Sequence, residues 1–500
     1  MLSHPAVAVA SNPPDPRSVS QMFSYVVGDA QSNLKFAART ARLLEDQFIV
    51  DGWPVGRIYG SEAELARRYH VGRAVVRETA RILEARGTAR MRRGRHGGLE
   101  VTPPHAERLF EMISSYCYLI GASREHIRSA RVALDRVAAC LATEAAAHLE
   151  FVPLLHREFM DGPAVGRNLR RLLTTAAGNQ VVTFYSNCLD QLDTLQLHEG
   201  GAAEYVRRPG TLRKCFDRLV RAVSRGDTHA AAAWASACSH RMDEHAAGQH
   251  SSIAEARAAE HRSGATRLTR AVQIVHNMMT RVGSGQWTDG VLLGNEFELC
   301  DRYRVDRGVV RQAIRILEAA ETAISMTGRG RGLVARTPGP SSVVRLICCH
   351  FAATRIGHHQ AFEVFRWLGV EMVRLAARQA TRESVAPIDE ALALLRKRSG
   401  NVLQSDLIEF EERQFALAGN PVLNLFFRSA KAFPSWATQG NMPMTPQMLR
   451  DFLDCSAEVV AALGARNPVA AAAAQEKKYM LLKRGIGDLF SNFRSGSLVP

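Results

Sequence analysis

Arginines recur at helical spacing in two places along the chain. Arg73, Arg77 and Arg81 stand four residues apart, and residues at this spacing share one face of an α-helix. A helix with such a cationic edge can lie in the major groove of DNA, where a guanidinium binds guanine O6 and N7 or a phosphate. Residues 307–315 repeat the pattern with three more arginines. The spacing therefore predicts contact with nucleic acid.

The residues around the first arginine run predict a helix-turn-helix. Ser61 followed by Glu64 is a capping box, which predicts a helix over residues 62–69. A short turn containing Gly72 then leads to a second helix over residues 73–86. Two short helices joined by a tight turn, the second beginning with arginine, are typical of a DNA-binding helix-turn-helix.

A β-hairpin with a cationic tip is predicted next. Residues 88–93 and 99–102 have short strand character and flank the run Gly94-Arg-His-Gly-Gly98. This is the arrangement of a winged helix, in which glycine lets the wing backbone approach a sugar–phosphate rail. Arg95 and His96 are then expected to reach a phosphate or the minor groove.

The chain contains this pattern twice. Residues 61–85 and 295–319 align with a shift of 234 residues, and 15 of those 25 positions are identical. The same shift places Trp53 over Trp287 and the first glycine-rich run over residues 328–332. Identity of this extent predicts a tandem duplication. A solvated helix face is the plain alternative for the arginines, but turn, cap and wing agree at both places.

Each copy divides into a winged helix and an all-helical part, so the expected fold is mainly α. Proline-rich boundaries separate the two parts, and a segment rich in Ala, His, Ser and Gly separates the copies. The predicted organisation is a tail over 1–20, a winged helix over 21–103, a helical domain over 104–248, a linker over 249–265, a second winged helix over 266–338, a second helical domain over 339–490 and a tail over 491–500.

Positive charge dominates the composition. The chain has 64 Lys and Arg against 49 Asp and Glu, a net charge of +15, which favours a polyanionic partner. Residues 57–100 hold 11 arginines and five glutamates, whereas residues 294–336 hold eight arginines and six acidic residues. We therefore expect the second winged helix to bind DNA more weakly or to prefer a different half-site.

Several classes of protein are not expected from this sequence. The sequence contains no stretch of about 18 apolar residues, so no membrane-spanning helix is expected. The first residues lack the basic start of a signal peptide and are therefore expected to form a loose tail. The nine cysteines include no Cys-x-x-Cys pair, so buried reduced thiols and a cytoplasmic location are expected. Because the Gly-x-Ser-x-Gly, P-loop and His-Glu-x-x-His motifs are absent, no enzyme is expected.

The motifs of the first copy follow a known order. From Glu62 the chain reads Glu-x-Glu-Leu-Ala-x-x-Tyr-x-Val-x-Arg-x-x-Val-Arg-Glu, followed by Leu-Glu-x-x-Gly and a Gly-Arg-x-Gly-Gly wing. This pattern resembles the GntR family of bacterial transcriptional regulators, and the helical part that follows resembles the FadR-like, or FCD, type. The resemblance implies DNA contacts at Ser61, Arg73, Ala74, Arg77, Arg95, His96 and Gly97 in the first copy, and at Arg307, Gly308, Arg311, Arg329, Gly330 and Arg331 in the second.

One departure from the family affects both copies. The family often has arginine two residues after the capping residue, whereas this chain has Ala63 and Phe297. One expected contact is therefore missing twice, and Phe297 is either core packing or a lost polar contact. Asp306 is a better helix cap than the matching Gly72. We predict a competent second winged helix, with a degenerate one kept for assembly as the alternative.

The helical halves resemble FCD domains at their opening helices, residues 131–143 and 365–377, and at a Gly-Asn landmark. Many relatives hold a metal there through one Asp and three His. The first three of these positions align with Gly166, Arg170 and Phe216 in the first copy and with Leu407, Glu411 and Ser456 in the second, and the last with His240 and Met480. No metal and no cofactor are therefore expected. A metal-free effector pocket stays open, with Arg170, Asn179, His240, Glu411 and Asn420 as candidates, although surface exposure is expected for Arg170 and Glu411.

These features together predict a sequence-specific transcriptional regulator that binds operator half-sites through two winged helices. The partners expected are duplex DNA and, in the helical domains, a small-molecule effector that the sequence does not identify. The two copies pair either within one chain or in a homodimer, and the choice between repression and activation stays open. The alternative is an architectural or protein-interaction scaffold with a degenerate second DNA-binding domain.

Overall fold

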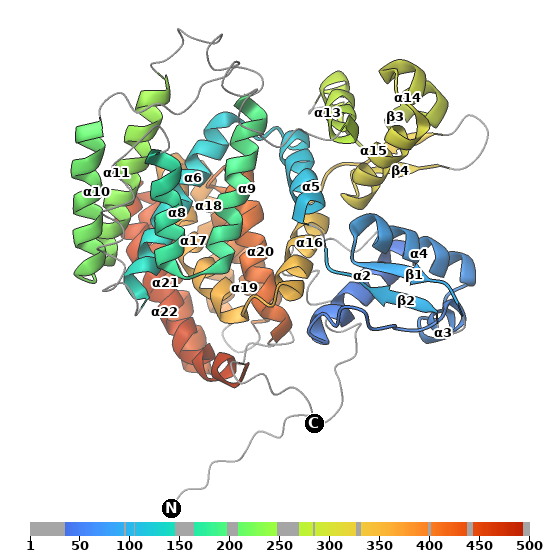
Figure 1. Cartoon of the computed structure of the whole chain (residues 1–500). Helices are drawn as coiled ribbons and strands as arrows, with labels where there is room; N and C mark the ends of the chain where they lie inside the picture. Colours follow the sequence, from blue (N-terminus) through green and yellow to red (C-terminus); the bar gives the residue numbers. More distant parts are fainter. Residues whose placement is uncertain are drawn as a thin grey trace, which may run out of the picture.

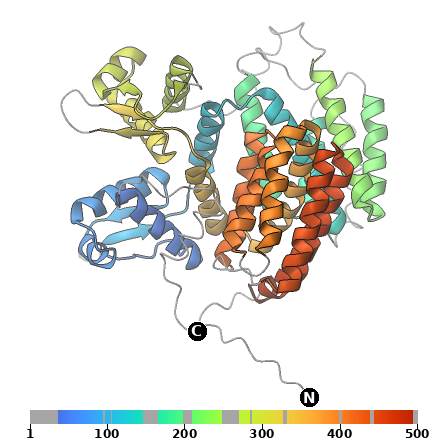
Figure 2. The same cartoon turned by 180° about the vertical axis from the view of Figure 1, so that it is seen from behind.

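The computed structural model describes residues 36–94, 97–104, 106–145, 165–197, 209–247, 270–283, 286–326, 332–398, 402–437 and 444–493. The described chain is mainly helical, as predicted. A large helical body stands beside two small lobes, which lie one above the other along one side of it (Figure 1). The opposite view shows the same division (Figure 2).

The first lobe contains the predicted helix-turn-helix and hairpin. It consists of helices α2 (Phe36–Val50), α3 (Glu62–Arg68) and α4 (Arg73–Arg86) and of strands β1 (Ala89–Arg92) and β2 (Gly98–Val101), which pair antiparallel. The apolar stripe of α4 is buried, and Thr79 on α4 donates a hydrogen bond of 3.2 Å to the carbonyl oxygen of Ala37 on α2. The bounds predicted for these helices and strands are confirmed to within a residue, whereas α2 was not predicted.

The second lobe repeats this order with one addition. Its elements are α13 (Arg270–Val282), β3 (Leu292–Gly294), α14 (Glu296–Tyr303), α15 (Arg307–Ala319), β4 (Ala323–Ser325) and β5 (Leu333–Ala335). The strands form a three-stranded sheet in the order β3-β5-β4. The first lobe has only a single bridge, between Ile58 and Glu100, where the second has β3.

Glycine where the second strand of each hairpin begins permits close backbone packing. A Cβ atom on Gly98 would lie 2.4 Å from the carbonyl oxygen of Gly60, and one on Gly332 would lie 2.5 Å from that of Gly294. No other side chain fits at such distances. The glycine-rich character of the hairpins therefore has a structural cause inside each lobe.

The helical body consists of two sets of helices, separated in sequence by the second lobe, and the described residues of both halves are helical, as predicted. Both sets contribute to one hydrophobic core. The first set is α5 (Ala106–Leu119), α6 (Arg124–Glu144), α8 (Val165–Ala177), α9 (Gln180–Leu197), α10 (Pro209–Ser224) and α11 (Thr228–Ala247). The second set is α16 (Pro340–Ala353), α17 (His358–Gln379), α18 (Arg382–Lys397), α19 (Gln404–Ala416), α20 (Pro421–Ala437), α21 (Pro446–Gly464) and α22 (Pro468–Phe493), which extends past the predicted boundary at residue 490.

The two sets contact each other reciprocally. The side-chain amide of Asn179 donates to the carbonyl oxygen of Gln360 at 2.9 Å, and that of Asn420 donates to the carbonyl oxygen of His126 at 2.8 Å. Between them the rings of Tyr185 and of Phe426 stack with centroids 4.4 Å apart. Asn179 and Asn420 are the Gly-Asn landmarks of the two copies, so equivalent residues make equivalent contacts in both directions.

Each lobe packs on the first helix of the helical set that belongs to the other copy. Helix α2 of the first lobe packs on α16, where Arg345 forms an ion pair with Asp46. Helix α13 of the second lobe packs on α5, where the hydroxyl oxygens of Tyr118 and Thr280 lie 2.5 Å apart. The first lobe therefore contacts the second helical set through α2, and the second lobe contacts the first helical set through α13.

No helix in the described part of the chain is long and apolar enough to cross a membrane. The nine cysteines are free thiols, and eight of them are buried. Burial raises the pKa of the Cys117 thiol to about 12, which keeps it protonated and unreactive near neutral pH. The predicted burial of the cysteines is confirmed for eight of the nine, and Cys300 is half-buried.

Candidate nucleic-acid interface

The first lobe presents α3 and α4 as predicted from the capping box. The backbone amide of Ser61 donates to the Glu64 carboxylate at 2.7 Å, and the amide of Glu64 donates to the Ser61 hydroxyl at 3.3 Å. The hydrogen bond from the Ser61 backbone and that from its hydroxyl lower the pKa of Glu64, so the cap stays ionised. The Ser61 hydroxyl therefore serves first to begin α3 and to fix its angle to α4.

The amino-terminal face of α4 is exposed. Arg73, Ala74 and Arg77 all point to solvent at the start of the helix. No described side chain forms an ion pair with Arg73, whereas the Arg77 Nε atom lies 3.0 Å from the Glu62 carboxylate on α3. The Arg77 side chain keeps 67% of its surface exposed. Exposed ion pairs contribute only about 0–1 kcal/mol, so a phosphate or a guanine can replace this carboxylate.

The second lobe repeats the same geometry. Asp306 caps α15 by accepting a hydrogen bond of 3.0 Å from the Val309 amide, which confirms it as a better cap than Gly72. Arg307, Gly308 and Arg311 are exposed. Arg311 pairs with Glu296 of α14 at 3.0 Å, the same distance as in the first lobe. The two lobes thus offer the same pair of arginines in the same setting.

Phe297 is a chemical difference between the two lobes, because the first lobe has Ala63 at the matching position. Its side chain is 71% exposed, so core packing, one of the two interpretations of this residue, is wrong. It borders an open depression of about 440 Å³ between α13 and α14, whose lining includes Arg270, Arg304 and Asp306. The matching Ala63 is also exposed but carries no such apolar surface.

The wing tips are only partly described. Arg95, His96, Arg329, Gly330 and Arg331, all expected at DNA, lie outside the described residues. Gly97 is described, and a Cβ atom there would lie 2.2 Å from the carbonyl oxygen of Arg92. The hairpin itself therefore requires glycine at residue 97, whatever the wing contacts.

In the helical body the charged candidates are buried, which corrects the expectation that they are exposed. Arg170 on α8 is 7% exposed and Glu411 on α19 is 6% exposed. Arg170 lies 3.6 Å from the Asp135 carboxylate, and Glu411 lies 3.0 Å from the Lys478 ammonium. Arg170 and Glu411 occupy matching positions in the two copies. At this position the interior of the first half therefore carries a positive charge and that of the second half a negative charge.

The other three pocket candidates serve different purposes. Asn179 and Asn420 cap α9 and α20 and hydrogen-bond across the two halves, so their amides are already engaged. His240 is exposed on α11 and does not face the interior. None of the three lines the depression beside Phe297.

The positions that hold metal in relatives do not fit a metal here. Arg170 places a guanidinium at one of them, Phe216 fills another, and Met480 is 41% exposed. In the described part of the chain no group of three or more His, Cys, Asp and Glu side chains is placed to hold a metal ion. The Lys478 ammonium beside Glu411 puts a fixed cation in the second half instead.

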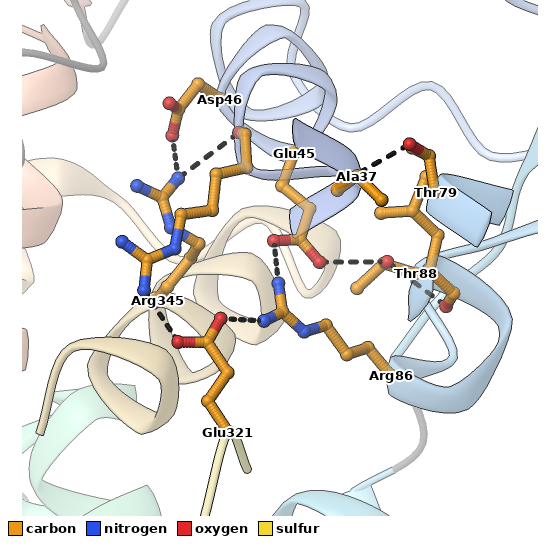
Figure 3. Close-up of polar contacts among 10 residues, drawn as sticks. Ala37, Glu45, Asp46, Thr79, Arg86, Thr88, Glu321 and Arg345 are labelled. Carbon is orange, nitrogen blue, oxygen red and sulfur yellow. Dashed lines mark hydrogen bonds and ion pairs between the residues drawn. The ribbon is translucent and has the colours of Figure 1, made fainter. Parts of the chain in front are cut away.

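Sequence reasoning missed one group of residues entirely. Arg42 and Arg86 of the first lobe bind Glu321 of the second, so charged side chains join the lobes to each other (Figure 3). The alignment of the two copies contained a signal for this contact, because Glu321 stands where the first copy has Gly87. An acidic residue at a helix-ending glycine position calls for an explanation.

Comparison with known families identifies part of the chain. Residues 360–477 match the family model described as FCD domain. This stretch of the second helical half is similar to FCD domains. The match begins in α17 and ends within α22, so it includes Glu411 and stops one residue before Lys478. A search of curated proteins found no match.

Solved structures similar to the chain are distant. GntR from Streptococcus agalactiae is 20% identical with a TM-score of 0.35, and the alignment covers 43% of this chain and 99% of that one. McbR/YncC from E. coli is 14% identical over 45% of this chain and 100% of its own, with a TM-score of 0.23. A GntR family transcriptional regulator from Pseudomonas syringae pv. tomato str. DC3000 is 19% identical over 50% of this chain and 100% of its own, with a TM-score of 0.16.

Proposed function

We propose that this chain is a sequence-specific DNA-binding transcriptional regulator of the GntR type. The observation that carries the proposal is the doubled geometry of the lobes. In each, a capped short helix supports a second helix with two exposed arginines at its start, and a hairpin follows. The FCD domain behind the lobes supports the same function.

We place the DNA along the face formed by the starts of α4 and α15. The amino-terminal end of a helix attracts phosphate through its free amide groups and its dipole. Arg73 and Arg307 extend from these ends and are exposed, and Arg77 and Arg311 lie one turn further along. On binding, Arg77 and Arg311 exchange a carboxylate partner for DNA, while the hairpins follow the sugar–phosphate backbone.

The chain is proposed to act as its own dimer. The reciprocal hydrogen bonds of Asn179 and Asn420 and the stacking of Tyr185 on Phe426 support pairing of the two halves inside one molecule. Two unequal lobes on one chain suit an operator with two unequal half-sites. The mass in solution separates this arrangement from a homodimer with four lobes.

The second helical half is where we propose a response to a small molecule. It is the half that matches the FCD family, and its interior holds polar groups with no hydrogen-bond partner among the described residues, namely the Gln414 amide, the Lys431 ammonium and the Ser456 hydroxyl. Unpaired buried polar groups are costly unless water or a ligand satisfies them. A screen of small polar metabolites for a shift in the melting temperature, repeated on Gln414→Leu, tests this placement.

The decisive experiment is selection of random oligonucleotides by the full chain, followed by competition at fixed salt. We expect a motif with two half-sites, and a specific duplex that outcompetes random DNA by at least about a thousandfold. Binding that depends steeply on salt but shows no sequence preference would favour the architectural alternative. The domain boundaries predicted above remain part of the proposal.

A further inference from the structure

A buried charge cluster joins the two lobes. The Glu321 carboxylate accepts a hydrogen bond of 2.5 Å from Arg86 and one of 2.7 Å from Arg42. Arg86 also binds Glu45 at 2.8 Å, and the side chains of Arg86 and Glu45 are wholly inaccessible to solvent. The Thr88 hydroxyl donates to the same Glu45 carboxylate at 3.1 Å. Figure 3 shows the carboxylate of Glu321 reaching from its own lobe to the guanidinium of Arg86.

The backbone of Glu321 is held in an unfavourable conformation. Its φ angle is 57°, in the left-handed region that residues with a Cβ atom rarely adopt. The matching residue of the first lobe is Gly87, with a φ angle of 73°, where glycine ends α4 without steric cost. The second copy therefore has a residue with a steric cost at a turn where glycine would have none. The contacts of the Glu321 side chain explain why this residue is present.

The cluster is one-sided. Two first lobes that met through this surface would repel, because the arginines of one would face the arginines of the other. Two second lobes would also repel, because Glu321 of one would face Glu321 of the other. The positions that match Arg42, Glu45 and Arg86 are His276, Met279 and Ala320 in the second lobe. Opposite charges meet only when a first lobe faces a second lobe, so this surface fits its companion in the same chain.

The position of the cluster restricts how the two DNA-reading helices sit. Arg86 is the last residue of α4, and Glu321 follows the end of α15. Helices of 14 and 13 residues are about 20 Å long each at 1.5 Å per residue. The two helices are in contact, so Arg73 and Arg307 at their far ends are separated by at most about 50 Å, the two helix lengths plus roughly 10 Å across the contact. One turn of B-DNA, about 34–36 Å, lies within this limit.

We infer that Glu321, through Arg42 and Arg86, is a positioning residue that fixes the separation of the two lobes, so that one chain reads two half-sites at a single spacing of no more than about 15 base pairs. This inference rests on the proposed function. The partner that fits is a duplex whose half-sites differ and stand at that spacing.

Each lobe has contacts with the helical body that do not depend on the cluster. Glu321 also accepts a hydrogen bond from the Ser342 hydroxyl of α16, but the ion pair of Asp46 with Arg345 and the contact of Tyr118 with Thr280 do not involve Glu321. Replacing Glu321 therefore loosens one lobe against the other and leaves each attached to the body.

The test uses two substitutions of Glu321 in the full chain. Glu321→Gln removes the charge and keeps the shape, and Glu321→Gly removes the side chain and relieves the backbone. Glu390→Gln, on an exposed face of α18, is the control with the same change in charge. A cooperative melting transition in all three variants shows that they fold, with a lower midpoint expected for the two Glu321 variants.

The first measurement needs no DNA. Hydrogen–deuterium exchange at residues 84–88 and 319–323 is expected to rise at least tenfold in both Glu321 variants and to stay unchanged in Glu390→Gln. Unchanged exchange in both Glu321 variants would overturn the cluster as a contact that holds the lobes together, even if DNA binding is confirmed.

The second measurement uses duplexes in which two selected half-sites are moved apart one base pair at a time. The unaltered chain is expected to prefer one spacing by at least tenfold, the Glu321 variants to bind neighbouring spacings within about threefold, and all to bind an isolated half-site alike. A spacing preference that survives in both variants refutes the inference and leaves the proposed function standing. Selection of no motif by the unaltered chain refutes the proposed function, and with it the half-site inference, while the exchange result still decides the contact.

Discussion

The arginines at the start of α4 offer the sharpest test of DNA recognition. We predict that Arg73→Ala combined with Arg77→Ala weakens binding to the selected operator by about 2–5 kcal/mol, or roughly 30-fold to several thousandfold. Arg73 has no ion-pair partner among the described residues, so its loss removes about 1–3 kcal/mol. Arg77 contributes somewhat less, because it gives up its exposed pair with Glu62 on binding.

The assay is a fluorescence anisotropy titration of a labelled operator at several salt concentrations. Each lost phosphate contact is expected to reduce the slope of log K against log salt by about one, whereas a lost base contact relaxes the sequence preference at one position. Arg378→Ala with Arg382→Ala is the matched control, because both residues are exposed on the helical body and the net charge changes equally. The recognition-helix assignment is wrong if the α4 variant behaves like this control in affinity and in preference.

The ion pair between Glu62 and Arg77 allows a second test of the same surface. Glu62→Gln is expected to strengthen operator binding by up to about fivefold, because Arg77 no longer leaves a carboxylate to reach DNA. Glu296→Gln is the matching change in the second lobe, where Arg311 makes the same pair. If Glu62→Gln weakens binding instead, the pair positions Arg77 for DNA.

Other regions of the chain give further predictions. Gly98→Ala should destabilise the first lobe by about 1–3 kcal/mol in urea unfolding, because the new methyl group would meet a carbonyl oxygen at 2.4 Å; equal stability would refute the packing argument. Tyr185→Phe should cost about 1 kcal/mol, because its hydroxyl donates to the carbonyl oxygen of Phe426 at 3.0 Å inside the core, and a melting temperature equal to that of the unaltered chain would contradict this. Burial raises the pKa of Glu321, but its two arginine partners outweigh burial and lower the pKa to about 2. Its contribution of roughly 3 kcal/mol is therefore complete above about pH 5 and lost as pH falls toward 2, which hydrogen exchange at several pH values can follow; exchange independent of pH over that range would contradict it. Treatment with a chelator should leave the melting temperature unchanged, and a fall would show a metal site.

Local structure near the proposed DNA-binding face could be predicted from the sequence because its causes are local. The Ser61–Glu64 capping box, the spacing of the arginines and the glycine-rich hairpin each act within a few residues. The bounds of α3 and α4 followed from these signals almost to the residue. The doubling of the pattern was visible for the same reason, since identity between segments needs no knowledge of how they pack.

Burial of charge was the point at which sequence reasoning failed. Arg170 and Glu411 were expected at the surface because isolated charges are rarely buried. Each has a partner on another helix, at Asp135 and Lys478, and such a partner is decided by packing and not by neighbours in sequence. The exposure of Phe297 is the converse case, because apolar character alone does not place a side chain inside.

The amino-acid sequence by itself determined the short-range structure of this protein: the capped helices, the cationic faces, the hairpins and the presence of two copies. Tertiary structure alone decided which copy touches which. Glu321 meets Arg86 across 235 positions of chain, and Asn179 meets Gln360 across 181. Contacts over such separations depend on how whole helices pack, and no spacing rule within one segment encodes them.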